Sequence, residues 1–263
     1  MSTDADRTID ALQSGHDDLA GLVRTLTPEQ LTGPSGASEW DVSQVLSHLG
    51  SGAVITKAGL DGALSGTGNP APDFNQGVWA RWNAMTPQER ADGFLAADAE
   101  LLAAYQRMDG QVRESLRTDL GFLPEPVDLA TAAGFRLNEF ALHSWDVRVA
   151  FDPAATIRPE AVPLLVDRVA FLLGWVAKPA ALDGRSGTLL VRLSDPEQEF
   201  GLRLGEGVGI VPAPAQPDGV LTAPAEAWLR LATGRLSAEH TPSQVEITGD
   251  IDLATLRRVF PGF

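Results

Sequence analysis

The segment FRLNEFALHSWD, residues 135–146, is the most informative part of the chain. Its spacing predicts a helix from about residue 129 to residue 150, ended by Asp152-Pro153. Large apolar side chains occupy several angles around this helix, namely Phe135, Phe140, Leu142 and Trp145. A surface helix keeps one apolar face and one polar face. The pattern therefore predicts a helix that is largely buried in a helical bundle.

Four polar side chains of this segment share one stripe of the predicted helix: Arg136, Glu139, His143 and Asp146. At about 100° per residue they fall within about 80° of one another. Glu139 and His143 are four residues apart, so a carboxylate and an imidazole converge, as ligands of one divalent cation do. The alternative is a solvated pair that stabilises a surface helix by about 0.2–0.5 kcal/mol. Burial of this helix favours the metal site over the solvated pair, because burying Glu and His side chains without partners costs free energy.

The chain has four histidines, and His48 is a candidate third ligand. It lies between Val45 and Leu49 in an apolar stretch that predicts another helix of the bundle. The alternative for His48 is a core histidine held by a hydrogen bond. His16 and His240 lie in polar stretches and are predicted to be solvated, and His16 stays a weaker candidate ligand.

Three further helices are predicted before this segment. The first has apolar residues at helical spacing over residues 9–26. The second begins where Ser38, followed by Asp41 three residues later, resembles a capping box. After a loop at residues 66–72, more helical material covers residues 79–105. Four main helices in about 150 residues indicate a bundle.

The second half of the chain changes to short β-rich runs bounded by Gly, Pro and Asp, which are typical of strands and hairpins. Strands are expected at residues 188–193, 199–204, 207–211 and 244–248, and helices at residues 159–176, 223–233 and 253–259. This order predicts a small α+β domain. We expect the boundary near residues 152–160, which divides the chain into residues 1–155 and 156–263.

The composition excludes several classes of function. The 263 residues carry a formal net charge of −15 and contain no cysteine. An acidic field repels a phosphate backbone, so no nucleic-acid partner is expected. Disulfides, thiolate ligands and a cysteine nucleophile are impossible without cysteine. No signal peptide or membrane span is found, so no membrane partner and a cytoplasmic location are expected.

Two motifs, in this order and at this separation, resemble the mycothiol-dependent maleylpyruvate isomerase family. They are the segment from Trp40 to His48-Leu49, and Arg136-x-x-Glu139-x-x-x-His143-x-x-Asp146. Further similar patterns are Gly234-Arg235-Leu236, Thr248-Gly249-Asp250 and the terminal Phe260-Pro261-Gly262-Phe263. The resemblance implies an α+β protein, with a DinB-like four-helix metal-binding domain followed by a small α+β domain related to sterol-carrier folds. It also implies that His48, Glu139 and His143 are the metal ligands.

The implied cofactors are a divalent metal, zinc in the family, and mycothiol or a similar thiol as co-substrate. Ligand type alone also permits nickel, cobalt, manganese or iron(II). Two histidines and one carboxylate leave a coordination position open for a further ligand. Since the chain has no thiol, the resemblance implies that a low-molecular-weight thiol adds to a small-molecule electrophile. The fold does not separate an isomerase from a thiol S-transferase.

Three other side chains have expected roles near this site. The resemblance implies that Arg235 holds an anionic substrate, and the alternative is a solvated arginine at a helix end. Asp146 is expected to orient a ligand histidine, and Arg136 to balance the charge around the cofactor site. Trp79, Arg81 and Trp82 are candidates to line a pocket, and the alternative for the two tryptophans is the core.

Two other classes of function remain open from the sequence. In the first, the chain is a non-enzymatic module whose α+β domain carries a lipid-like ligand, with a structural metal or none. In the second, it is a DinB-like regulatory protein with a vestigial site. The intact set of His48, Glu139 and His143 argues against the second.

Overall fold

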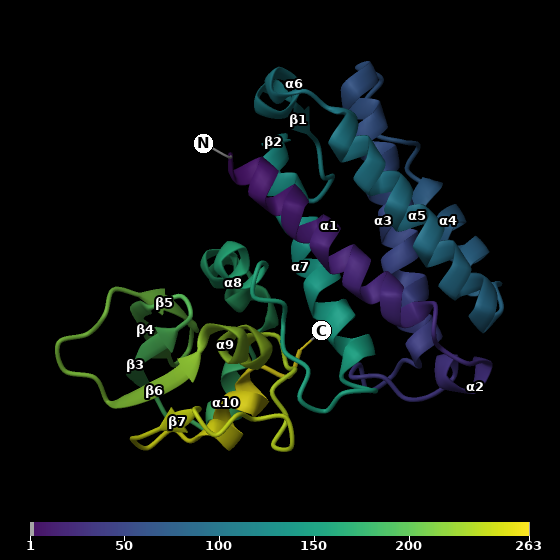
Figure 1. The fold of residues 1–263 in the computed structure, drawn as a ribbon. Coiled ribbons are helices and arrows are strands. Elements are labelled where there is room, and N and C mark those ends of the chain that lie inside the picture. Colours follow the sequence, from purple (N-terminus) through teal and green to yellow (C-terminus); the bar gives the residue numbers. More distant parts are fainter. Residues whose placement is uncertain (1–2, 263) are drawn as a thin grey trace. The chain divides into compact units, whose positions relative to one another are not determined.

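The structure is a computed structural model that describes residues 3–262, so Phe263 of the terminal pattern lies outside the described residues. The chain divides into two compact units, Met1–Ala155 and Thr156–Phe263. The first unit is helical, and the second combines helices with a five-stranded sheet (Figure 1). The predicted order, a helical part followed by an α+β part, is confirmed.

Four long helices form the body of the first unit. They are α1 (Asp4–Val23), α3 (Val42–Ser65), α5 (Pro87–Arg107) and α7 (Leu129–Arg148). Helix α1 packs against α5 and α7, and α3 packs against the same two helices. Each long helix thus packs against two neighbours, which produces a single shared core.

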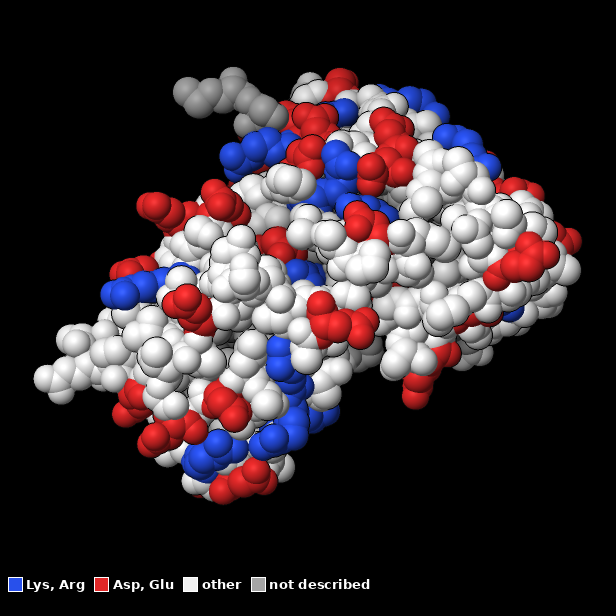
Figure 2. Space-filling model, turned by 60° about the horizontal axis from the view of Figure 1, so that its bottom comes forward, with Lys and Arg blue, Asp and Glu red and all other residues white. Residues whose placement is uncertain are grey.

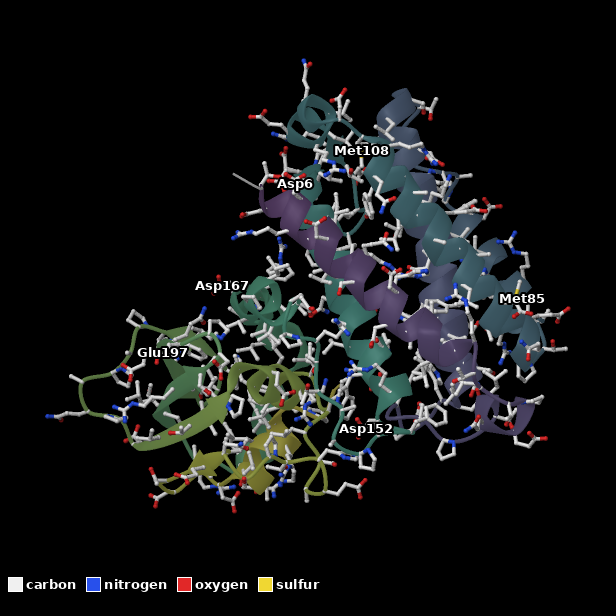
Figure 3. All side chains as sticks on the ribbon, in the orientation of Figure 1. Asp6, Met85, Met108, Asp152, Asp167 and Glu197 are labelled. Atoms are coloured by element: carbon white, nitrogen blue, oxygen red, sulfur yellow. The ribbon has the colours of Figure 1, made fainter. Side chains whose placement is uncertain are left out.

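Shorter elements connect the long helices. They are α2 (Pro28–Leu31), α4 (Phe74–Asn83), α6 (Gly110–Ser115), and the antiparallel pair β1 (Arg117–Thr118) and β2 (Val127–Asp128). Asp6 lies in the first turn of α1 (Figure 3). Arg113 of α6 bonds the Asp6 carboxylate (Nη1–Oδ1 2.6 Å). Arg113 also donates from Nη2 to the Tyr105 carbonyl at the end of α5, at 3.1 Å. Arg113 therefore joins α6 to the start of α1 and to the end of α5. These positions are distant in the sequence from residues 35–52.

The start of α3 differs from the sequence prediction. The N-cap is Asp41, not Ser38: the Asp41 carboxylate accepts from the Gln44 N–H at 2.8 Å. The Gln44 side chain returns the bond to the Asp41 N–H at 2.9 Å, which completes the capping box. Ser38 lies in the preceding turn. An acidic residue three positions after Ser38 matched the motif, yet the same aspartate is itself a strong cap.

The second unit is built on a mixed sheet of strand order β5-β4-β3-β6-β7. The strands are β3 (Gly187–Ser194), β4 (Gln198–Leu204), β5 (Gly209–Val211), β6 (Gly219–Pro224) and β7 (Glu246–Ile247). The other elements are α8 (Val162–Val176), the 3-10 helix η1 (Pro179–Leu182), α9 (Ala225–Ala232) and α10 (Leu253–Val259). Helix α9 packs on α8 and on strands β3 and β6. Trp228 of α9 lies against Phe200 and Phe260, with ring centroids 5.5 and 6.4 Å apart.

Strand β6 was absent from the sequence prediction, which began a helix at Ala223. Residues 219–224 instead pair in parallel with the central strand β3, and α9 begins only at Ala225. The segment holds few strongly β-preferring residues, so its local signal is weak. Its partner β3 lies about thirty positions earlier in the chain, and a pairing of that separation leaves no local pattern.

The surface of the described residues mixes both signs of charge. Acidic and basic side chains are interspersed on the face that Figure 2 shows. Among the described residues, no helix combines the length and the apolar character that crossing a membrane requires.

Gly50 provides a test of the bundle packing. A Cβ at Gly50 would lie 2.1 Å from the Trp82 ring, which is buried between α3 and α5. We expect Gly50→Ala to lower the free energy of unfolding by about 1–3 kcal/mol, because overpacking displaces Trp82. Urea unfolding followed by circular dichroism measures this change.

Gly59→Ala is the matched control in the same helix, because its Cβ would meet only the Asn69 side chain at 3.9 Å. It should raise stability by about 0.5–1 kcal/mol, since alanine lowers the entropy of the unfolded helix segment. Equal effects of the two substitutions would contradict the packing of Trp82 against Gly50.

Candidate metal centre

Helix α7 is buried along most of its length. Buried side chains occupy all sides of it, including Leu137, Phe140, Trp145 and the polar residues Arg136, His143 and Asp146. Its N-cap is Asp128, whose carboxylate accepts from the Thr131 N–H at 2.7 Å. The prediction of a buried helix with a polar seam is confirmed. Each polar group of the seam consequently needs a partner inside the bundle.

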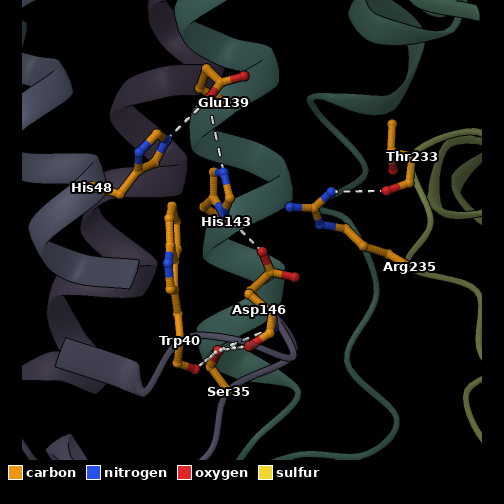
Figure 4. A network of polar contacts seen from close by, with 9 residues as sticks. Ser35, Trp40, His48, Glu139, His143, Asp146, Thr233 and Arg235 are labelled. Carbon is orange, nitrogen blue, oxygen red and sulfur yellow. Dashed lines mark hydrogen bonds and ion pairs between the residues drawn. The ribbon is translucent and has the colours of Figure 1, made fainter. Parts of the chain in front are cut away.

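Three side chains converge where α3 faces α7 (Figure 4). The Glu139 Oε2 atom lies 3.1 Å from His48 Nε2 and 3.8 Å from His143 Nε2. One ligand atom from each of the three residues lies within 4.8 Å of the other two. The side chains of His48 and Glu139 are 36% and 39% exposed, whereas that of His143 is 6% exposed. The cluster is thus buried on the His143 side and open on the other.

Local structure explains why these side chains meet. Glu139 and His143 lie one turn apart on α7, so their side chains point to the same side of the helix. His48 lies in the second turn of α3, at a position set by the cap at Asp41. The sequence predicted the α7 pair from its spacing, and the packing of α3 against α7 brings His48 to it.

Asp146 fixes the orientation of His143. Its Oδ2 atom lies 2.8 Å from His143 Nδ1, and Asp146 is completely buried. A carboxylate only accepts, so Nδ1 carries a proton, and Nε2 is the nitrogen that faces Glu139. A carboxylate bonded to the far nitrogen is the usual partner of a metal-ligating histidine. Asp146 therefore lies where an orienting side chain is needed.

The carboxylate of Glu139 is held in its charged form. Burial alone would raise the pKa of Glu139. The hydrogen bond with His48 and the nearby His143, His48 and Arg136 outweigh burial and lower the pKa below its ordinary value. Glu139 is therefore an anion at neutral pH and is ready to act as a ligand.

Trp40 forms one wall of the cluster, a role that its place in the sequence did not predict. Its ring centroid lies 5.2 Å from that of His48 and 5.8 Å from that of His143. The loop before α3 holds it there: the Gly36 N–H donates to the Asp146 carbonyl at 2.7 Å. The Ser35 hydroxyl donates to the Trp40 carbonyl at 2.7 Å. An apolar aromatic side chain directly before a helix is a weak signal, since many such residues only cover a core.

Arg136 bonds to groups outside the cluster of His48, Glu139 and His143. Its Nη2 atom donates to Asp98 Oδ1 of α5 at 2.6 Å and to the Leu49 carbonyl of α3 at 3.0 Å. The other oxygen of Asp98 lies 2.8 Å from His16 Nδ1. The prediction that His16 is solvated is wrong, because His16 is buried and bonded to Asp98. Its polar neighbours in the sequence face solvent, while the α1 register turns His16 inward.

Asp98 is a buried charged residue that the sequence did not single out. Burial would raise the pKa of Asp98, but the charge of Arg136 and the hydrogen bond from His16 lower it below its ordinary value. An aspartate inside an amphipathic helix gives no local sign of burial, so only the bundle packing identifies it.

The remaining candidates are Trp79, Trp82 and Arg235. Trp82 is core, whereas Trp79 is 48% exposed. Arg235 belongs to the second unit and follows Gly234, whose φ of +76° ends helix α9. Its guanidinium is buried, not solvated, and donates to the Thr233 carbonyl at 3.0 Å. The binding of an anionic substrate by Arg235 stays a prediction.

Comparison with solved structures supports the fold. The crystal structures of the mycothiol-dependent maleylpyruvate isomerase and of its histidine-to-alanine mutant each align with a TM-score of 0.67. Each alignment covers 96% of this chain and 98% of the other, at 14% sequence identity. At this identity the likeness concerns the fold alone.

Sequence comparison identifies the family. Two curated relatives from strains of Mycobacterium tuberculosis, both described as uncharacterized proteins, are 26% identical over 163 residues. The alignment covers 61% of this chain and 74% of each relative. The SCP-2 sterol transfer family matches residues 173–258. The mycothiol maleylpyruvate isomerase N-terminal domain family matches residues 12–148, and the chain belongs to that family.

Proposed function

We propose that this protein is a metal-dependent enzyme that activates a low-molecular-weight thiol for addition to an electrophilic small molecule. The observation that carries the proposal is the convergence of His48, Glu139 and His143, with His143 oriented by a buried carboxylate. Two imidazole nitrogens and one carboxylate oxygen form a donor set that suits zinc.

The spacing of the donor atoms fits a divalent ion. Two ligand atoms about 2.1 Å from a tetrahedral zinc lie about 3.4 Å apart. The distances of 3.1 and 3.8 Å from Glu139 Oε2 to the two Nε2 atoms lie on either side of that value. Three protein ligands leave a position open, which is typical of catalytic sites, whereas structural sites are closed by four ligands.

The thiol must come from outside the chain, because the sequence has no cysteine. The name of the family refers to mycothiol, and so does the name of the isomerase whose crystal structures align with this chain. These names support mycothiol or a similar thiol as the co-substrate. A bound divalent ion lowers the pKa of a coordinating thiol and keeps it as a thiolate near neutral pH.

The residues of the chain have separate roles in this proposal. His48, Glu139 and His143 hold the ion, and Asp146 keeps the proton on His143 Nδ1. Trp40 covers one side of the two imidazoles and restricts water there. The thiolate sulfur forms a C–S bond to the electrophile, and the electron pair of the attacked double bond moves to the adjacent carbon. In an isomerase, rotation and cleavage of the same C–S bond return the thiol; in a thiol S-transferase, protonation leaves the conjugate as product.

The ligand assignment is tested by metal content. Protein purified without chelator should contain close to one zinc or other divalent ion per chain, measured by inductively coupled plasma mass spectrometry. His48→Ala and Glu139→Gln should lose most of it, because each removes one of three protein ligands. His240→Ala serves as the histidine control and should retain the metal. Near-stoichiometric metal in all four proteins would exclude this ligand set.

The role of Asp146 is tested by metal affinity. Asp146→Asn should weaken metal binding about 10–100-fold, because the amide no longer fixes the tautomer of His143 as a carboxylate does. Competition with a chromophoric chelator measures the dissociation constant. Asp92→Asn, on the exposed face of α5, should leave it unchanged. An unchanged affinity in Asp146→Asn would remove Asp146 from the site.

Thiol consumption tests the reaction itself. With mycothiol and a reactive electrophile, the metal-loaded protein should consume the thiol, and a chelator or Glu139→Gln should return the rate to the uncatalysed level. Loss of free thiol is followed with a disulfide reagent. Bound metal without consumption, across several thiols and electrophiles, would favour the non-enzymatic binding module instead.

A further inference from the structure

A buried network of polar and charged groups joins all four long helices of the first unit. His16 comes from α1, Asp98 from α5 and Arg136 from α7, and the network ends on the Leu49 carbonyl of α3. The three side chains belong to residues that are 6%, 2% and 5% exposed. The thiol chemistry proposed above uses none of these groups directly.

Stability alone does not explain this network. Removing charges from water costs several kcal/mol per ion, and well-packed apolar residues often replace a buried ionic triad without loss of stability. A network of short, directional bonds does, however, define the relative positions of the helices more sharply than apolar contacts do. The place of the network in the bundle therefore indicates which parts of the helices it holds in position.

The network acts next to the metal ligands on both helices. Arg136 lies one turn before Glu139 on the same side of α7, and Leu49 is the residue after His48 on α3. The bond from Arg136 Nη2 to the Leu49 carbonyl, 3.0 Å long, therefore ties the His48 turn to the Glu139 turn.

Gly52 makes room for this bond. A Cβ at Gly52 would lie 3.0 Å from Arg136 Nη1, so the guanidinium lies directly against the α3 backbone. Asp98 holds the guanidinium through a second bond, and His16 holds Asp98.

We propose that Arg136 is a positioning residue that sets the distance of His48 from Glu139 and His143, and that Asp98 and His16 fix its guanidinium. This inference rests on the proposed metal site. This positioning role differs from charge balance, because Arg136 acts on the α3 backbone through its bond to the Leu49 carbonyl. The expected consequence of disturbing the network is a changed coordination geometry in a bundle that remains folded.

The test replaces the network in two ways. The variant His16→Leu/Asp98→Leu/Arg136→Met removes all three polar groups together and leaves no buried charge unpaired. Gly52→Ala keeps every charge but places a methyl group against the guanidinium, while its helix propensity favours the fold. Both are loaded with Co²⁺, whose visible absorption reports coordination geometry, and metal affinity is measured by chelator competition.

We expect the triple variant to bind metal about 10–100-fold more weakly, as is common for outer-shell partners, with a shifted Co²⁺ spectrum. Gly52→Ala should show a change of the same sign and smaller size, at a melting temperature no lower than that of the wild type. Two controls should match the wild type: Arg113→Met, which breaks a comparable bridge to Asp6 and the Tyr105 carbonyl, and Gly59→Ala.

The outcomes separate this inference from the proposed function. If the wild type binds no Co²⁺ or Zn²⁺, the metal site itself is wrong. If the wild type binds metal and Gly52→Ala or a folded triple variant keeps its affinity and spectrum, only the positioning role is overturned. If the triple variant does not fold, Gly52→Ala still tests the positioning role, because this substitution keeps all the charged groups of the network.

Discussion

Burial of the polar seam on α7 governs the arrangement of the first unit. A helix with apolar side chains all round must lie inside the bundle, and its polar groups then need partners there. Arg136 donates to Asp98 and to the Leu49 carbonyl. His143 donates to Asp146, and Glu139 lies against His48. These partners come from α3, α5 and α7 itself. The hydrogen bonds that pair the polar groups of α7 therefore also fix the positions of α3 and α5.

The polar residues around the candidate metal centre differ in their exposure to solvent. Arg136 and Asp146 are buried and bonded to protein groups, while the side chains of His48 and Glu139 are more than a third exposed. A rigid, buried support beneath a partly open cluster suits a site that must hold its ligands and admit another molecule. Trp40, held by the loop before α3, adds an apolar wall beside the imidazoles.

Family membership and geometry support different parts of the account. The match over residues 12–148 establishes the family, while the solved structures at 14% identity support the fold. Neither identifies the reaction, because one fold serves many chemistries. The proposed thiol chemistry instead joins two facts about this chain, an open set of three ligands and the absence of cysteine.

Local signals in the sequence were enough to predict the helical first half, most strands of the second half, and the shared side of α7 on which Glu139 and His143 lie. Helical and strand periods are carried by neighbouring residues, so these features need no knowledge of distant contacts. Packing between distant segments was required to place His48 beside that pair, to turn His16 inward to Asp98, and to make residues 219–224 an inner strand of the sheet. Each of these depends on contacts between parts of the chain far apart in sequence, and such contacts leave no periodic pattern in either part.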